Sequence, residues 1–455
     1  MSSSPPIVVI GAGVAGLSIS AALRARGREA IIFESSDRAG GKIRSIRDGD
    51  FLLEAGPAGF VDTSPEVQAL LTRLNLQSRI IRSGADAQRR FLYLDGRLVP
   101  APDSPLSAAR SVVLSRSARL RALGDLVLPR GPSGLGEEES VADLARRRLG
   151  SDAADRIIAP FVSGLFAGDP EALSAAAAYP KLAAAEHDHR SLLVAAWRAW
   201  KEERSRPGAL STHVSFVDGM QELTNALGQA AGASLHLGAT VKRIEKRGDI
   251  FEIYVEEAGA VKTLTAAGVA LTVPAFVAAP LVAPLDAALA DAAAAIPYAP
   301  IAVIHLAYNR SAVRHPLDGY GFLAPAGQGL RILGAAFSSN IYDGRAPSGT
   351  VLFLARLGGA NNPDLAALPE DALIATVHED LSRALGIDAP PIFARVFRHP
   401  RAMPQYTLGH LKRVATIEAA ERRVGKIALA GNAYRGLALT DCIREADAIT
   451  DRLDM

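Results

Sequence analysis

Three glycines and one acidic residue near the N-terminus have the spacing of a dinucleotide-binding site. Gly11, Gly13 and Gly16 directly follow an apolar run at 7–10, and Glu34 ends the next apolar run. In such a unit the first glycine allows a tight turn, the second lets the backbone approach a pyrophosphate, and the third lets helix and strand pack closely. The N–H groups at the helix start attract the pyrophosphate, and the acid accepts hydrogen bonds from a ribose hydroxyl. The expected cofactor contacts are Gly11, Ala12, Gly13, Val14, Ala15, Gly16, Glu34 and Ser35.

A second glycine-rich segment favours a flavin over a nicotinamide. The pair Gly40-Gly41 follows the ribose-binding acid and precedes Lys42, so this loop can pass close to a diphosphate and the edge of a flavin ring. An apolar run broken by glycine and proline comes next, at 53–60. The pattern resembles the flavin-containing amine oxidase superfamily, in which the chain returns to the flavin in its middle and near its C-terminus. The expected contacts from these two segments are Gly41, Lys42, Gly56, Pro57, Ala58 and Gly59.

The composition is that of an ordinary globular protein. The 455 residues are 49% hydrophobic and 22% charged, enough for two or three domains with buried cores. The net charge is only +2, and the arginines are spread along the chain without a long basic block, so we expect no nucleic-acid partner. Cys442 is the one cysteine of the sequence, which excludes an intramolecular disulfide and a multi-cysteine metal site. We therefore expect no metal and a reducing, cytoplasmic compartment.

An uncharged stretch at 264–285 is long enough to span a membrane. Three prolines interrupt it, at 274, 280 and 284, so we expect a buried strand followed by a short helix instead. The first residues carry neither a basic segment nor a long apolar core, so we expect no signal peptide.

The order of these segments predicts an α/β fold (α+β overall), in which a Rossmann-type FAD-binding domain is joined to a mixed-sheet substrate domain and a helical insertion. The Asp95-Gly96 pair between two apolar runs predicts a hairpin with a type I′ turn. We expect helices over most of 105–201 and an irregular loop at 160–170. The expected boundaries are 1–84, 206–278 and 410–455 for the FAD-binding domain, 85–97 and 279–409 for the substrate domain, and 98–205 for the insertion.

Five further segments narrow the family. They lie at 88–93, 160–170, 186–192, 404–410 and 431–443, and include Ser-Gly-Leu-Phe-Ala-Gly-Asp-Pro and Gly-Asn-Ala-Tyr-Arg-Gly-Leu-Ala-Leu. Together, and in this order, they resemble the oxygen-dependent protoporphyrinogen oxidases and the related bacterial coproporphyrinogen III oxidases. The resemblance implies a haem-biosynthetic enzyme that oxidises protoporphyrinogen IX to protoporphyrin IX by six electrons, with FAD as cofactor and with O₂ reduced to H₂O₂. The alternatives are oxidation of coproporphyrinogen III to coproporphyrin III, another amine-oxidase-type flavoenzyme, or a non-catalytic tetrapyrrole carrier.

The resemblance also implies roles for individual residues. Arg90 matches the family's arginine that binds a substrate propionate, and a guanidinium fork suits a carboxylate. Gly164 matches a loop glycine whose carbonyl faces the pyrrole N–H groups. Both would position the substrate, because hydride transfer to a flavin needs no side-chain base. The implied flavin contacts outside the N-terminal motifs are Val241, Asn432, Leu437, Ala438 and Leu439.

One position departs from the family. Many members carry an aromatic residue or methionine where this chain has Arg356, directly before Leu357-Gly358-Gly359. We expect Arg356 to stack on the macrocycle or to reach an additional propionate. The second case would favour coproporphyrinogen, which has four propionates, over protoporphyrinogen, which has two. The expected partners are the porphyrinogen, O₂, the inner face of the cell membrane as a peripheral contact, a second copy in a homodimer, and ferrochelatase as acceptor of the product.

Overall fold

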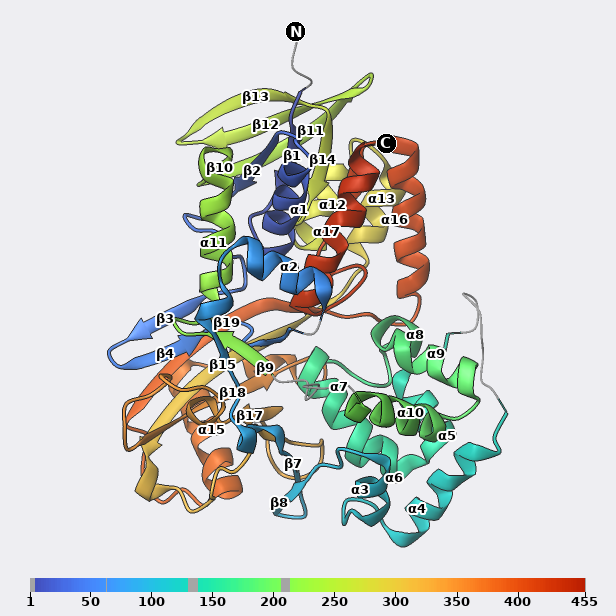
Figure 1. Cartoon of the computed structure of the whole chain (residues 1–455), viewed down its shortest axis with the longest axis vertical. Helices are drawn as coiled ribbons and strands as arrows, with labels where there is room; N and C mark the ends of the chain where they lie inside the picture. The colour runs from blue at the N-terminus through green and yellow to red at the C-terminus, as the bar shows by residue number, and fades with distance from the viewer. Residues whose placement is uncertain (1–4, 63, 130–137, 206–212, 455) are drawn as a thin grey trace.

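The computed structural model describes residues 5–62, 64–129, 138–205 and 213–454. Figure 1 shows a lobe that carries both chain ends, and below it a β-rich part and a helical part side by side. The upper lobe is built on a parallel five-stranded sheet whose strands come from distant parts of the chain. Its strand order is β10 (Leu235–Leu237), β2 (Ala30–Glu34), β1 (Ile7–Ile10), β14 (Gly268–Leu271) and β20 (Ile427–Leu429).

Two apolar cores cover the faces of this sheet. One contains residues of α1 (Val14–Ala25), α2 (Pro65–Arg73), α11 (Gln221–Ala231) and α17 (Leu439–Asp454). The other contains residues of β11 (Ala239–Arg247), β12 (Ile250–Glu257), β13 (Ala260–Ala266), α12 (Ala275–Val282), α13 (Ala287–Ala294) and α16 (His410–Val424). The expected boundary at 278/279 is wrong, because it cuts α12, and Leu281, Val282 and Leu289 are buried in this second core. The second chain segment of the β-rich part begins with β15 (Tyr298–Asn309) instead.

The β-rich part is a mixed seven-stranded sheet. Its order is β19 (Phe393–Pro404), β15 (Tyr298–Asn309), β18 (Thr350–Gly358), β17 (Gly334–Ala336), β16 (Gly321–Leu323), β7 (Arg90–Leu94) and β8 (Arg97–Pro100). The pair β7–β16 is parallel and the others are antiparallel. The predicted hairpin is confirmed: Asp95 and Gly96 both have positive φ, as a type I′ turn requires. Helix α15 (Glu370–Leu385) packs on one face, which leaves the other for the site.

The helical part follows β8. It contains α3 (Pro105–Arg110), α4 (Arg116–Leu123), α5 (Val141–Leu149), α6 (Ser151–Ala153), α7 (Ala159–Phe166), α8 (Ala175–Ala178), α9 (Pro180–His189) and α10 (Leu192–Ser205). A fully buried ion pair, 2.5 Å between Arg148 Nε and Asp125 Oδ1, ties α5 to the segment after α4. The expected irregular loop at 160–170 is wrong at 160–166, which belongs to helix α7. The expected insertion boundary at 205/206 borders 206–212, which lie outside the described residues.

Short strands link the two lobes. β3 (Ser45–Asp48) and β4 (Phe51–Glu54) form a hairpin, while β5 (Phe60–Val61), β9 (His213–Phe216) and β6 (Ile80–Arg82) form a small sheet. The uncharged stretch 264–285 forms the end of β13, then β14, then α12 with Pro280 inside it. Among the described helices, none combines the length and the apolar character that crossing a membrane requires.

Candidate active site

The turn between β1 and α1 is shaped by two of its three glycines. Gly11 has φ +103°, a conformation that residues with a side chain rarely adopt. A Cβ on Gly16 would lie 2.0 Å from the Gly11 carbonyl oxygen, so any larger residue would push α1 away from the strand. A Cβ on Gly13 would meet no atom within 4 Å. The backbone at Gly16 is therefore packed against the protein, whereas the backbone at Gly13 borders open space.

Glu34 lies beside this turn at the end of β2. Its Oε2 accepts a hydrogen bond from the Ala12 N–H at 2.8 Å, and its Oε1 accepts one from the Ser36 N–H at 2.9 Å. The carboxylate is half-buried, whereas the neighbouring Ser35 is exposed. The acid is thus held next to the backbone that would carry a diphosphate.

The loop after β2 closes over the same turn. Gly40 N–H donates to the Ala12 carbonyl at 2.8 Å, and a Cβ on Gly41 would come within 3.3 Å of Gly13 Cα. The guanidinium of Arg38 donates to the carbonyls of Gly41 and Ile43, at 2.6 and 3.1 Å, and so fixes the loop. We did not predict a role for Arg38 from the sequence, although an arginine two residues before a glycine pair was a usable signal.

Lys42 is a half-buried cation that faces the other parts of the site. Its ammonium donates to the Ala402 carbonyl in β19 and lies 5.5 Å from the centre of the Tyr298 ring. Burial lowers its pKa to about 8, although the nearby Cys442 thiol in α17 opposes this shift. The second glycine loop, the β-rich part and the C-terminal helix therefore meet at Lys42.

Two histidines hold the start of the segment 54–59 through its backbone carbonyls. His305 Nε2 lies 3.0 Å from the Glu54 carbonyl, and His399 Nε2 lies 2.7 Å from the Ala55 carbonyl. Burial lowers the pKa of His305 to about 4, so it is neutral at physiological pH and donates one N–H. A Cβ on Gly56 would lie 2.0 Å from the Lys42 carbonyl oxygen, which explains the glycine there.

The expected C-terminal contacts surround the start of α17. The carbonyl of Asn432 accepts a hydrogen bond from the Tyr406 hydroxyl, which also accepts one from the Gly436 N–H, at 2.9 and 3.0 Å. Ala438 N–H donates to Asp441, and Leu439 begins the helix. Val241, the expected mid-chain contact, lies in β11 with its side chain in the core, so the predicted contact would use its backbone. The remaining members of the expected set, Val14, Ala15, Pro57, Ala58, Gly59 and Leu437, lie in the same segments.

Arg90 and Arg356 lie on one face of the seven-stranded sheet. Arg90 pairs with Gly321 across β7 and β16, and that row continues through Ala336 to Leu354 in β18. Cross-strand neighbours share a face, and so do residues two apart in a strand, which places Arg356 on the face of Arg90. The apolar cluster on this face includes Leu354 and Ala336 together with Ala58 of the predicted flavin-binding segment and Ala167 after α7.

Arg90 is exposed and is held by aromatic groups. Its Nη2 lies 2.8 Å from Nε2 of His213, and its guanidinium carbon lies 5.4 Å from the centre of the Tyr320 ring. Burial and the Arg90 charge lower the pKa of His213 to about 4, so the imidazole is neutral and accepts the hydrogen bond. In the described part of the chain, no carboxylate forms an ion pair with Arg90. The cation is therefore available for an anionic ligand.

Gly164 and Arg356 are in direct contact. Arg356 Nη1 donates to the Gly164 carbonyl at 3.0 Å, across 192 residues of sequence. A Cβ on Gly164 would come within 2.5 Å of Leu323 Cδ2. Three residues predicted to bind substrate thus lie around one face, with Gly164 and Arg356 hydrogen-bonded to each other.

The likeness to known proteins agrees with this geometry. A family model described as flavin containing amine oxidoreductase matches residues 14–450. The chain belongs to this family. A chloroplastic protoporphyrinogen oxidase of Nicotiana tabacum is 32% identical over 96% of this chain and 83% of its own, and a coproporphyrinogen III oxidase of Propionibacterium freudenreichii is 30% identical over 98% and 90%. A crystal structure from Exiguobacterium sp. 255-15, of a protein provisionally named protoporphyrinogen oxidase, shares the fold over 100% of both chains, with a TM-score of 0.82 and 22% identity.

Membership of the family makes the protein a flavin-dependent oxidoreductase and confirms the predicted resemblance. The β1–α1 turn fits a flavin nucleotide, because the backbone at Gly13 borders open space beside free N–H groups of a helix start. Two polar residues of types common in active sites, Gln405 and His410, are instead hydrogen-bonded to backbone carbonyls of the protein. Gln405 Nε2 donates to the Phe166 carbonyl at 2.9 Å, and His410 stacks on Tyr406 and lies 3.0 Å from the Tyr434 carbonyl.

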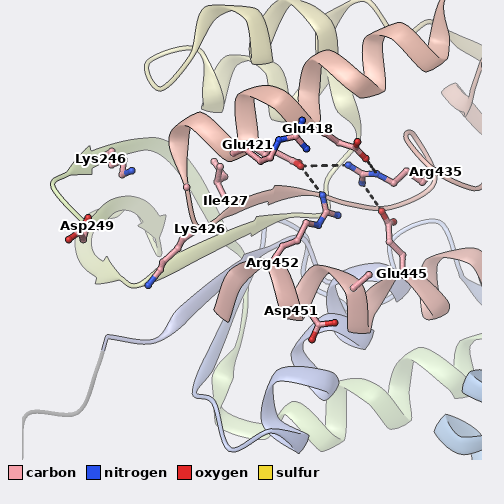
Figure 2. Close-up of a pocket in the computed structure, with 13 residues that line it drawn as sticks. Lys246, Asp249, Glu418, Glu421, Lys426, Ile427, Arg435, Glu445, Asp451 and Arg452 are labelled. Carbon is pink, nitrogen blue, oxygen red and sulfur yellow. Dashed lines mark hydrogen bonds and ion pairs between the residues drawn. The ribbon is translucent and has the colours of Figure 1, made fainter. Parts of the chain in front are cut away.

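A large hollow lies outside the set of expected site residues. It has a volume of about 990 Å³ and lies between α16, α17, β20 and the turn from β11 to β12. Figure 2 shows Arg435 in ion pairs with Glu418, Glu421 and Glu445 there, at 2.8, 3.6 and 2.7 Å. The Gly431 N–H also points at Glu445, at 3.4 Å. This network braces the turn that leads from β20 to the expected flavin contacts.

Proposed function

We propose that this flavoenzyme binds FAD and oxidises a porphyrinogen to a porphyrin. The main candidate reaction is the removal of six electrons and six hydrogens from protoporphyrinogen IX, with three O₂ reduced to three H₂O₂. When bound, FAD supplies the hydride-accepting ring and the reactivity toward O₂. The likeness to a named protoporphyrinogen oxidase supports this reaction, and the likeness to a named coproporphyrinogen III oxidase keeps the second substrate open.

One observation carries the proposal: Arg90, which has no carboxylate partner among the residues that the structure describes, lies on the sheet face that the Gly164 carbonyl at the end of α7 also borders. In our proposal Arg90 binds a propionate of the substrate through its guanidinium fork. The Gly164 carbonyl accepts a hydrogen bond from the pyrrole N–H groups, and the apolar face around Leu354 supports the macrocycle. The protein's part in the reaction is to orient the substrate and exclude water, so no side chain needs to take a proton.

Coproporphyrinogen III is the second candidate because Arg356 adds a cation to the same face. Four propionates could engage both arginines from opposite edges of the ring, whereas two propionates lie on one edge. This alternative concerns the substrate and leaves the chemistry unchanged.

An anaerobic assay with purified, FAD-loaded protein tests the function. Each porphyrinogen should bleach the flavin absorbance, and air should restore it together with porphyrin fluorescence and H₂O₂. Arg90→Met should raise the KM about tenfold or more, because it removes a charge-assisted hydrogen bond. Arg89→Met is the matched control, since Arg89 is paired with Asp318. Flavin that neither porphyrinogen bleaches would contradict the proposal.

We also propose a peripheral contact with an anionic membrane surface. The segment 105–127, which contains α3 and α4, exposes apolar side chains. Four arginines lie among them, Arg110, Arg116, Arg119 and Arg121. Its one acid, Asp125, is fully buried against Arg148. Exposed apolar groups mixed with cations are typical of surfaces that rest on anionic lipid. The homodimer and the transfer of product to ferrochelatase stay predictions.

A further inference from the structure

The Gly164 carbonyl lies where a helix leaves carbonyls unsatisfied. Helix α7 ends at Phe166, and Ala167 follows with φ +48°. The last four carbonyls of a helix have no partner within it, and Gly164 belongs to that set. Arg356 reaches this carbonyl from β18 at 3.0 Å. In the free protein, the carbonyl proposed to receive substrate N–H groups therefore already accepts a hydrogen bond from a cation.

Arg356 is poorly matched by this partner. A guanidinium has five donor hydrogens and a full charge, whereas a carbonyl oxygen is a neutral acceptor. Within the described ranges, Arg356 has no ion pair with a carboxylate, and burial lowers its pKa. A carboxylate binds a guanidinium more strongly than a carbonyl does, because both partners are charged and two parallel hydrogen bonds can form. Arg356 is thus held by a bond that an incoming carboxylate would replace.

The distance between Arg356 and Arg90 indicates the size of a ligand whose carboxylates could reach both cations. The two arginines share a sheet face and are separated by three strand spacings, about 14 Å between their strands. Gly164 packs over Leu323 on the same face, in a strand between them. A flat ligand that covers this carbonyl and carries carboxylates at opposite edges could meet both cations.

We propose that Arg356 is a carboxylate-operated cap on the Gly164 carbonyl, which selects tetrapyrroles with acidic groups at both edges of the ring. This inference rests on the proposed function and deepens it. A carboxylate at the far edge draws the Arg356 guanidinium away from Gly164. The freed carbonyl then accepts the pyrrole N–H groups, so one event binds an acid and opens the site for the ring.

Binding of porphyrins to the FAD-loaded protein tests the cap without relying on turnover. The two probes are coproporphyrin III, with four carboxylates, and its tetramethyl ester in detergent, with none; binding is followed by fluorescence quenching. Arg356→Met should weaken binding of the tetra-acid about tenfold or more, since a charge-assisted hydrogen bond is lost. The same change should leave binding of the ester equal or tighter, because the Gly164 carbonyl is no longer covered.

Two further variants make the result decisive. Arg356→Lys keeps the charge and should retain part of the affinity for the tetra-acid, while it loses the bidentate fork. Arg398→Met is the matched control, because Arg398 also donates to a backbone carbonyl, that of Leu368, from the opposite face of the sheet. It should change neither affinity.

The outcomes separate the cap from the proposed function. If Arg356→Met weakens both probes equally, or neither, the cap is wrong even where the wild-type protein oxidises a porphyrinogen. If the wild-type protein oxidises neither porphyrinogen and binds neither probe, the proposed function is wrong and the cap falls with it. Weaker binding of the tetra-acid together with equal or tighter binding of the ester supports the cap.

Discussion

Gly13 and Gly16 of the β1–α1 turn differ in what a Cβ atom would do there. At Gly16 it would disturb the packing of the protein, whereas at Gly13 it would only fill open space. Gly16 is required by the protein itself, because a Cβ there would overlap the Gly11 carbonyl. Gly13 has an ordinary φ of −71° and open space beside it. Packing within the protein therefore does not require a glycine at position 13, which agrees with the prediction that a diphosphate approaches the backbone there.

We predict that Gly13→Ala and Gly16→Ala separate these two requirements. Gly13→Ala should leave the stability of the FAD-free protein within about 0.5 kcal/mol and should weaken FAD binding at least tenfold. Gly16→Ala should lower both, with a loss of stability of about 1–3 kcal/mol from overpacking. Urea unfolding and flavin fluorescence titration measure the two quantities. Unchanged FAD affinity in Gly13→Ala would mean that the diphosphate lies elsewhere.

At the scale of elements, a buried acid joins the β3–β4 hairpin to the start of α11. Glu54 is 3% exposed and accepts hydrogen bonds from the Met220 N–H at 2.8 Å and the Ser45 hydroxyl at 2.7 Å. Burial raises its pKa from 4.5 to about 7, against the effect of these hydrogen bonds. The folded protein therefore holds a proton on Glu54 at pH values where the unfolded chain has lost it.

This difference predicts how stability depends on pH. Because its pKa is raised in the folded state, the contribution of Glu54 is fully present below pH 4.5 and is lost as the pH rises to about 7. The loss is at most about 3 kcal/mol, from 1.36 kcal/mol per pKa unit. Glu54→Gln keeps an acceptor but cannot ionise, so it should gain stability relative to the wild type between pH 4.5 and 8. Urea unfolding across this range measures the difference, and a constant difference would show that Glu54 does not titrate there.

The elements differ in how well the sequence predicts them. The first strand, turn and helix and the Asp95-Gly96 hairpin follow from local rules, and the structure confirms both. Helix α7 was missed because Pro160 and Gly168 look like breakers. Pro160, however, lies just after the π-helical turn Ala154–Ile158 within one continuous helical run from α6, and such wide turns accommodate a proline. Gly168 lies beyond the helix end. The contact between Gly164 and Arg356 joins residues 192 positions apart, and no local rule predicts it.

At the scale of the whole molecule, exposed apolar residues gather in the helical part. Val112, Leu120, Leu123, Leu126 and Val127 are 66, 71, 54, 54 and 83% exposed. They follow one another within 16 residues that include Arg116, Arg119 and Arg121. Figure 1 places α3 and α4 at the end of the molecule opposite the upper lobe, so this surface can rest on a membrane without covering the flavin-binding lobe.

This arrangement predicts binding to anionic vesicles that depends on both charge and apolar contact. The protein should sediment with vesicles of phosphatidylglycerol and phosphatidylcholine, and much less with phosphatidylcholine alone or at high salt, because each basic side chain adds about 1 kcal/mol near an anionic surface. The double variant Leu120→Glu/Val127→Glu should reduce binding at least tenfold, since it replaces apolar insertion with repulsion. Val261→Glu is the matched control, because Val261 is 64% exposed in β13 of the other lobe. Equal loss in the control would mean that charge alone drives the contact, and full binding by the double variant would place the membrane contact on another surface.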